Sequence, residues 1–233
     1  MPVLPPETLH EWNLSPAEAV ALQSRLASRV VLEDRFAPVR RVAGVDIGFE
    51  DDGATTRAAI VVLDWQAGGP PFEVVEQVVY REPTRMPYIP GLLSFRETPA
   101  ALGAFARLET RPELVMVDGQ GIAHPRRLGV ASLLGLWLDL PAIGVAKSRL
   151  CGRHDEVGDT RGEQTPLVHK GEVIGTVLRS RTRVKPLYVS PGHRVSQAAA
   201  LEWTLRFLHR TKLPEPTRLA DRLASRRDAS GRR

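Results

Sequence analysis

Two aspartates lie at positions where a carboxylate is costly unless it has a partner. Asp46 lies inside the apolar segment 42–48, and Asp118 ends the apolar segment 114–118 just before Gly119. A buried carboxylate is tolerated when it is paired or coordinates a cation, and Mg²⁺ prefers oxygen ligands. Two such strands, adjacent in one sheet, would place both carboxylates at one edge, which indicates a divalent-metal site. For Asp118 alone, a turn cap before glycine is the simpler interpretation.

Three other polar residues lie where they could serve the same chemistry. Glu97 comes early in a helix expected after a proline-rich loop, although Ser94 and Glu97 also fit a capping box. His124 lies between glycines and a pair of arginines, at the expected start of a helix, where a phosphate could bind. Lys147 ends an apolar segment and could stabilise developing negative charge or simply face solvent. Spacing alone fixes no role for these residues.

The first half of the chain contains the elements that must position Asp46. Ser15, Pro16 and Glu18 form a helix-start pattern of N-cap, first helical proline and capping box. An amphipathic helix with Val20 among its packing residues is expected to extend to about Val30. Three strands rich in Val and Ile follow, and the short turn segments between them predict antiparallel neighbours. These strands are expected at 41–49, 57–65 and 72–81.

The second half alternates between helices and strands. Three antiparallel strands followed by this alternation predict an α/β fold, in which one mixed β-sheet is flanked by helices. We expect a single domain over 1–233, with a core of about 12–210 and a helical, basic C-terminal extension at 211–233 whose end is disordered. Helices are expected at 92–108, 127–138 and 196–209, and strands at 114–118, 142–146, 166–169, 172–179 and 186–190.

The composition is compatible with a nucleic-acid partner. The chain has 233 residues, a net charge of +5 and a pI of about 9.9, and only four of its 32 Lys and Arg residues are lysines. Arginine binds phosphates through a planar bidentate fork, but a bias towards arginine codons would produce the same composition. The tail 222–233 holds five arginines against one aspartate. It is either a phosphate-binding arm or a solubilising terminus.

No segment predicts membrane insertion or secretion. The longest apolar stretches, such as 130–138 and 58–63, are too short to cross a bilayer. The first residues lack the charged and apolar regions of a signal peptide. Cys151 is the single cysteine, which excludes an internal disulfide and fits a reducing compartment. We therefore expect a cytoplasmic protein with no membrane partner.

Five segments together resemble the endonuclease V family of repair nucleases. They are Val-Ala-Gly-Val-Asp-Ile-Gly at 42–48, Pro-Tyr-Ile-Pro-Gly-Leu-Leu-Ser-Phe-Arg-Glu at 87–97, Val-Asp-Gly-Gln-Gly-Ile-Ala-His-Pro-Arg-Arg-Leu-Gly at 117–129, Pro-Ala-Ile-Gly-Val-Ala-Lys-Ser-Arg-Leu-Cys-Gly at 141–152 and Pro-Leu-Tyr-Val-Ser-Pro-Gly-His at 186–193. Each segment alone is modest support. All five, in the family's order, are highly specific.

The resemblance implies a ribonuclease-H-like fold and a metal-dependent DNA repair endonuclease. The implied reaction is hydrolysis of the second phosphodiester bond 3′ to deoxyinosine, which leaves 3′-hydroxyl and 5′-phosphate ends. The implied cofactor is Mg²⁺, with Mn²⁺ as a substitute, and the implied partner is inosine-containing DNA bound by a monomer. Asp46 and Asp118 match the family's metal-binding aspartates, and Glu97 matches its third acidic residue, which the resemblance implies is the third metal ligand. His124 and Lys147 match basic catalytic positions.

The resemblance also implies how the lesion is recognised. Tyr88, Ile89 and Pro90 match a wedge that fills the space left when a base is flipped out of the duplex. We expect a hypoxanthine pocket in which glycines allow the backbone to approach the base, although turn geometry alone would also explain those glycines. The expected pocket residues are Gly91, Leu93, Gly119, Gly121 and Leu150. His193 is a weaker candidate near the same edge.

Other interpretations stay open at this point. The family contains members that prefer inosine in RNA, so an inosine-specific endoribonuclease is one alternative. Another ribonuclease-H-like nuclease, such as a junction resolvase, should lack the Tyr88 wedge. An actin-like ATPase or sugar kinase, with 45–48 as its phosphate loop, would need a second lobe for which the chain has little room. A non-catalytic nucleic-acid-binding protein is disfavoured because all three acidic positions are occupied.

Overall fold

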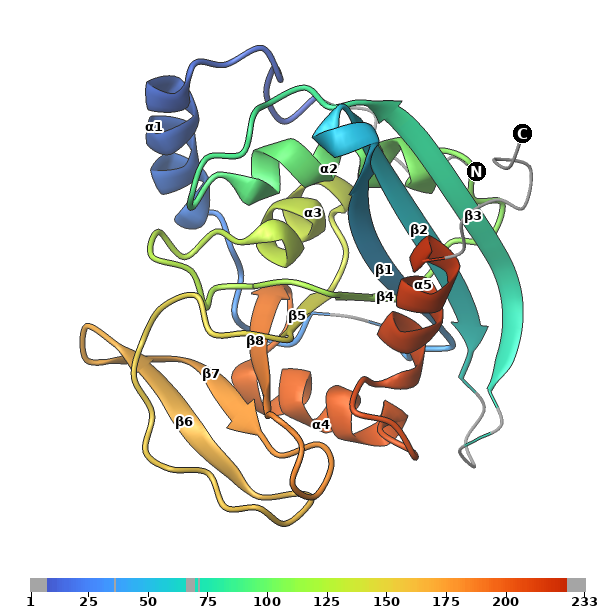
Figure 1. Cartoon of the computed structure of the whole chain (residues 1–233). Helices are drawn as coiled ribbons and strands as arrows, with labels where there is room; N and C mark the ends of the chain where they lie inside the picture. Colours follow the sequence, from blue (N-terminus) through green and yellow to red (C-terminus); the bar gives the residue numbers. More distant parts are fainter. Residues whose placement is uncertain (1–7, 36, 66–69, 71, 226–233) are drawn as a thin grey trace.

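One eight-stranded mixed sheet with helices on both faces forms the computed structural model of the chain (Figure 1). The structure describes residues 8–35, 37–65, 70 and 72–225. The strands are β1 (Arg41–Glu50), β2 (Thr55–Asp64), β3 (Glu73–Pro83), β4 (Leu114–Val117), β5 (Ala142–Ala146), β6 (Gln164–His169), β7 (Glu172–Leu178) and β8 (Leu187–His193). The helices are α1 (Pro16–Ala27), the 3₁₀ turn η1 (Asp51–Gly53), α2 (Leu93–Phe105), α3 (Val130–Leu138), α4 (Gln197–Phe207) and α5 (Glu215–Ser225).

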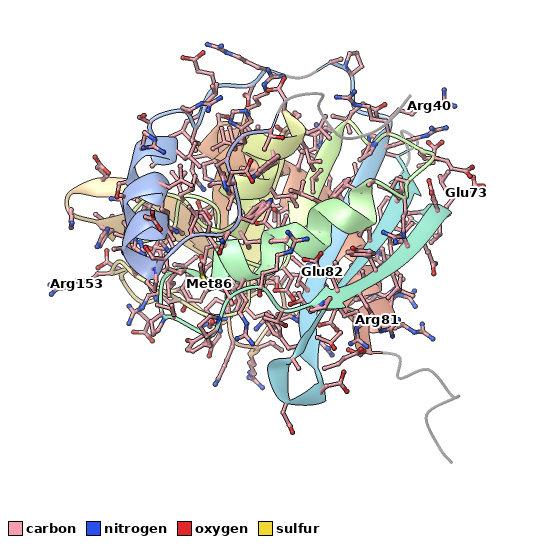
Figure 2. All side chains as sticks on the ribbon, turned by 90° about the horizontal axis from the view of Figure 1, so that it is seen from above. Arg40, Glu73, Arg81, Glu82, Met86 and Arg153 are labelled. Carbon is pink, nitrogen blue, oxygen red and sulfur yellow. The ribbon has the colours of Figure 1, made fainter. Side chains whose placement is uncertain are left out.

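The strand order is β3-β2-β1-β4-β5-β8-β7-β6. β1, β2 and β3 form the predicted antiparallel meander, whereas β4 and β5 run parallel to β1. β8 is antiparallel to β5, and β7 is antiparallel to β8, so β7 runs in the same direction as β5. Figure 2 shows the two ends of the sheet, with Glu73 of β3 on one side and Arg153, which bridges to Val168 of β6, on the other. The α/β prediction is confirmed.

Two hydrophobic clusters cover opposite faces of this sheet. Ala43 and Val45 of β1 pack in the cluster that includes residues of α1, α2 and α3. Val42 of β1 packs in the cluster that includes residues of α4 and α5. Successive residues of a strand point to opposite faces, so Asp46 points to the α5 face like Val42. The alternation of β1 therefore decides which helix can meet the Asp46 carboxylate.

Several predicted helix ends are shifted. The α1 capping box is confirmed, because the Ser15 backbone N–H donates to Glu18 Oε2 at 2.8 Å. The helix ends at Ala27 instead of Val30, and Val20 is exposed. α3 begins at Val130 instead of residue 127, because Arg127 has a φ of +60°, which is incompatible with a right-handed helix.

The core extends beyond the expected limit of residue 210. Helix α5 packs across β1 and β2, and its Ala220 is fully buried (Figure 1). Gly44 of β1 permits this contact, since a Cβ atom there would lie 2.0 Å from the Pro216 carbonyl oxygen. The C-terminal segment is therefore helical, as expected, but it is part of the packed structure. The predicted disorder at the end of the chain falls on residues outside those described.

Gly44→Ala should destabilise the protein because its new methyl group would collide with the α5 backbone. We expect a loss of about 1–3 kcal/mol in the free energy of unfolding, which is typical of overpacking. Gly48→Ala is the matched control on the same strand, since the nearest atom to its Cβ would be Arg57 Nη2 at 3.9 Å. Urea unfolding of both variants tests this, and equal stabilities would contradict the docking of α5 on Gly44.

Candidate functional site

Three aspartates from three separate elements meet at one edge of the sheet. Asp46 of β1, Asp118 after β4 and Asp221 of α5 each place a carboxylate oxygen within 4.8 Å of the other two. The Asp118 backbone N–H donates to the Val45 carbonyl at 2.9 Å, which continues the β1–β4 pairing to the level of Asp46. The predicted meeting of Asp46 and Asp118 is therefore observed. Asp221 was missed, since nothing in the sequence of the C-terminal helix distinguishes Asp221 from a solvent-facing acidic residue.

Lys147 bridges two of these carboxylates. It follows β5, and its Nζ forms ion pairs with Asp118 Oδ2 and, at 2.5 Å, with Asp221 Oδ1. Burial lowers the pKa of Lys147, but hydrogen bonds to the Asp118 and Asp221 carboxylates raise it. Together with the charges of these carboxylates, they outweigh burial, so the pKa of Lys147 lies above its ordinary value. Lys147 therefore stays protonated and partly offsets the negative charge of the cluster.

The carboxylates nonetheless repel one another. Burial, followed by the charge of Asp118, raises the pKa of Asp46 to about 7, although Lys147 opposes this shift. Burial and the charges of Asp46 and Asp118 also raise the pKa of Glu97 well above its ordinary value. Carboxylates with raised pKa values bind a proton near neutral pH unless a cation compensates their charge. Several oxygen donors crowded at one point fit a hard divalent cation.

Glu97 lies beside the three-aspartate cluster and does not cap its helix. The N-cap of α2 is Leu92, which makes no side-chain capping hydrogen bond, so the capping-box explanation of Ser94 and Glu97 is wrong. The Glu97 side chain is 7% exposed and is close enough to Asp46 and Asp118 to feel their charges. A buried carboxylate directed towards two others costs free energy. The position therefore favours a functional explanation over a structural one.

His124 has a different setting from the one predicted. It lies in the loop before α3 and not at a helix start. Its Nδ1 accepts from the Arg126 backbone N–H, and its Nε2 lies 3.1 Å from the Gly91 carbonyl. Burial and the charge of Arg126 lower the pKa of His124 to about 4. With both ring nitrogens occupied, the neutral imidazole holds the Gly91 loop in place and has no free nitrogen for proton transfer.

A buried glutamine of α1 holds the same loop. Gln23 Nε2 donates to the carbonyls of Leu128 at 2.8 Å and Gly91 at 3.2 Å. Its Oε1 accepts a hydrogen bond from Arg126 Nε, and Arg126 Nη2 donates to the Gly91 carbonyl at 2.8 Å. Gln23 is fully buried. This network was missed, because a glutamine between apolar residues of an amphipathic helix gives only a weak signal.

A cavity of about 350 Å³ opens beside the acidic cluster. Ligand pockets are typically roughly 300–1,000 Å³, so one base-sized group is a suitable occupant. Most of the predicted site residues line it, together with Gln120 and Arg149, which were not predicted. The predicted residues in its lining are Tyr88, Gly91, Leu93, Glu97, Asp118, Gly119, His124, Lys147 and Leu150.

The rim of this cavity is apolar and exposed. Tyr88, Leu93 and Leu150 have 66%, 39% and 49% of their surface exposed, respectively. Exposed apolar side chains grouped around a cavity are typical of a ligand site. Ile89, in contrast, packs against the core beneath the loop, and Pro90 is exposed. Of the predicted wedge residues, Tyr88 alone lines the cavity.

Gly121 and His193 are two further predicted site residues that do not line the cavity. Gly121 does not line the cavity, since it packs against β8, where a Cβ atom would lie 2.1 Å from the Pro191 carbonyl oxygen. His193 pairs with Ala142, which begins β5, whereas Lys147 follows the other end of that strand. Its Nδ1 accepts from the Val31 backbone N–H at 3.3 Å. The expectation that His193 lies near the catalytic edge is wrong, because the antiparallel β8 carries it to the opposite edge.

The sequence profile of the Endonuclease V family matches residues 24–222. The chain belongs to this family. The Endonuclease V of Azotobacter vinelandii is 56% identical over 224 residues, which cover 96% of this chain and 100% of that relative. The Endonuclease V of a Nostoc species is 52% identical, covering 94% and 97% of the two chains. The chain is accordingly an endonuclease of the deoxyribonuclease V type.

Solved Endonuclease V structures share this fold. The crystal structure of Endonuclease V from Streptomyces avermitilis is 40% identical, with a TM-score of 0.84, and the match covers 91% of this chain and 92% of that one. Endonuclease V of Ciona intestinalis, in complex with a 24mer DNA containing an inosine followed by a ribo-adenosine, is 26% identical with a TM-score of 0.75. That match covers 89% of this chain and 95% of that one.

The acidic cluster predicts an unusual pH dependence of stability. The folded-state pKa of Asp46 is about 7, and its unfolded value is about 3.9. Between these two pKa values, the folded protein binds more protons than the unfolded chain. The contribution of Asp46 to the free energy of unfolding therefore falls as the pH rises from one value to the other. In EDTA, Asp46→Asn should raise the melting temperature at pH 8 by at least about 2 °C and change it little at pH 5.

Differential scanning fluorimetry measures this difference. Asp155→Asn is the matched control, because Asp155 is exposed and remote from the cluster. Adding Mg²⁺ at pH 8 should stabilise the wild type more than Asp46→Asn, since a ligand stabilises the state that binds it. Equal Mg²⁺ shifts in the two proteins would contradict a cation site at Asp46.

Proposed function

We propose that this chain is a metal-dependent DNA repair endonuclease that recognises deoxyinosine. It hydrolyses the second phosphodiester bond 3′ to the lesion and leaves 3′-hydroxyl and 5′-phosphate ends. The observation that carries the proposal is the acidic cluster, in which carboxylate oxygens of Asp46, Asp118 and Asp221 lie within 4.8 Å of one another, next to a cavity of about 350 Å³. The inosine-containing DNA bound by the Ciona relative supports the choice of lesion.

Asp46, Asp118 and Asp221 would hold the metal, with Glu97 as the fourth acidic group. Mg²⁺, or Mn²⁺ in its place, would supply Lewis-acid stabilisation of the phosphate and a water of lowered pKa. Lys147 keeps its proton and fixes the orientation of Asp118 and Asp221, because it contacts both carboxylates. It also brings a positive charge to the place where a substrate phosphate must lie. Lys147 is thus a positioning residue that also attracts the anionic strand.

The cavity would receive the base after it leaves the duplex. An enzyme that inspects a base must extrude it, which costs a few kcal/mol. Tyr88 is two-thirds exposed at the rim, where its ring can stack on the bases left behind. Gly91 and Gly119 allow the backbone to approach the base. The hydrogen bonds from Gln23 and Arg126 to the Gly91 carbonyl keep this loop rigid, so little conformational entropy is lost on binding.

Inosine in RNA is the second candidate substrate. The DNA in the Ciona complex carries a ribo-adenosine directly after the inosine. A single ribonucleotide beside the lesion is compatible with an active site that accepts a 2′-hydroxyl. Matched DNA and RNA oligonucleotides, each with and without one inosine, distinguish these two substrates.

Asp46→Ala and Asp118→Ala should each reduce Mg²⁺-dependent nicking of inosine-containing duplex DNA by at least roughly 100-fold. Even groups that only support a metal ligand are worth about 10–100-fold. Asp155→Ala should nick like the wild type, and EDTA should stop nicking by both of these proteins. Denaturing gels locate the cut, and resealing by a DNA ligase reports the 3′-hydroxyl and 5′-phosphate ends. Full Mg²⁺-dependent nicking by Asp46→Ala would rule out the metal site.

Tyr88→Ala should weaken binding to inosine-containing duplex more than it slows cleavage of single-stranded substrate. Stacking of one base on an aromatic ring is worth about 1–3 kcal/mol, so the affinity should fall by about 5- to 150-fold. Leu205→Ala is the matched control, because it also removes an exposed apolar side chain, 42% exposed on α4. Fluorescence anisotropy and single-turnover nicking measure the two effects. Equal losses on both substrates would exclude the wedge.

A further inference from the structure

A second hollow, of about 480 Å³, lies outside the site described above. It is formed between the segment that follows β7 and the segment that follows α4. Guanidinium groups, hydroxyls and one imidazole line it, and none of the described lining residues carries a carboxylate. Its lining residues are Arg161, Ser180, Arg181, Thr182, His209, Arg210 and Thr211.

A buried hydroxyl without a partner belongs to a residue that lines this hollow. Ser180 is 3% exposed, and its Oγ has no hydrogen-bond partner among the described residues. A buried polar group without a partner is destabilising, so such groups are rare unless something else satisfies them. Since Ser180 lines the hollow, a rotation of its side chain would let this hydroxyl donate to an acceptor oxygen of a ligand there.

Arg161 connects the two segments by hydrogen bonds, so the hollow is already formed without a ligand. Its Nη2 donates to the Leu208 carbonyl at 2.9 Å, and its backbone N–H donates to Thr182 Oγ1 at 3.2 Å. Arg181 and Arg210 have no ion pair with any described residue. Two arginines without acidic partners beside a preformed hollow favour an anion with several oxygens, for which the guanidinium fork is suited.

The hollow lies along the same sheet edge as the acidic cluster. β7 runs parallel to β5, so Ser180 after β7 and Lys147 after β5 emerge at the same edge. β8 alone separates the two strands, which places their ends about 10 Å apart at the usual strand spacing. Lys212 follows the lining residue Thr211. Burial lowers the pKa of Lys212 most, and the charge of Lys147 lowers it as well, so the two lysines are close together.

We propose that this arginine hollow binds a backbone phosphate of the nucleic-acid strand that is being cut, close to the scissile bond. The proposal rests on the proposed function only in requiring a nucleic-acid substrate. A phosphate contact of this kind sets the position of the strand and carries no sequence information. The hollow therefore contributes equally to binding of DNA with and without a lesion.

Arg181→Gln and Arg210→Gln test the proposal on a duplex that lacks inosine. Each variant should bind about tenfold more weakly in fluorescence anisotropy. The slope of log K against log salt should fall in magnitude by about 1, as expected for one lost phosphate contact. Arg29→Gln is the matched control, because it removes the same charge near His193, at the opposite edge of the sheet. Wild-type affinity and slope in both Arg181→Gln and Arg210→Gln would overturn the proposal.

Ser180→Ala separates binding from folding. Removing a hydroxyl without a partner should leave the melting temperature unchanged or raised, and the affinity for the inosine-free duplex should fall several-fold. An unchanged affinity would mean that the hydroxyl does not face the phosphate and would count against the hollow. Nicking of inosine DNA by the wild type is scored separately. Its absence, together with the changed salt slopes, would refute the proposed function and leave the phosphate site standing.

Discussion

Mutual repulsion among buried carboxylates is the constraint on which the rest of this structure depends. β1 and β4 are adjacent and parallel, so Asp46 and Asp118 come to the same level, and α5 adds Asp221 from one face. Such a cluster is unfavourable without compensation. Lys147 supplies one positive charge, and the raised pKa values of Asp46 and Glu97 show that this charge is insufficient. A bound cation would supply the missing positive charge at a site that is destabilising by itself.

The surrounding structure holds this unfavourable cluster in place through packing. Both faces of β1 are covered, with α1, α2 and α3 contributing to one cluster and α4 and α5 to the other. Close contact of Gly44 with Pro216 brings α5 near enough to deliver Asp221. The C-terminal helix thus supplies a packing surface and an acidic group at once. Loss of its contact with β1 would remove both, which couples the stability of the fold to the composition of the site.

The recognition side of the site is stabilised by satisfied polar groups. The Gly91 carbonyl is approached by donors from Gln23, Arg126 and His124, all of which come from outside the 87–92 loop. A fully satisfied buried network makes a loop rigid. Tyr88 is therefore exposed on a loop that these hydrogen bonds hold in place at Gly91. The acidic cluster and the loop are thus held by opposite physical means, since the acidic cluster depends on unbalanced charge and the loop on balanced hydrogen bonds.

The sequence by itself determined the elements with strong periodicity and the residues that they carry. The β1–β3 meander, β5 and the meeting of Asp46 with Asp118 all follow from apolar strands interrupted by single carboxylates. Only the tertiary structure decided the rest. Asp221 is distant in sequence and lies on the C-terminal helix α5, and the antiparallel β8 places His193 at the opposite edge of the sheet. The two ring nitrogens of His124 form hydrogen bonds with backbone groups, and no pattern of side chains in the sequence predicts these partners. The local sequence specifies the spacing of apolar residues and hence which residues of an element are buried. The docking of helices and the direction of strands decide which distant side chains meet.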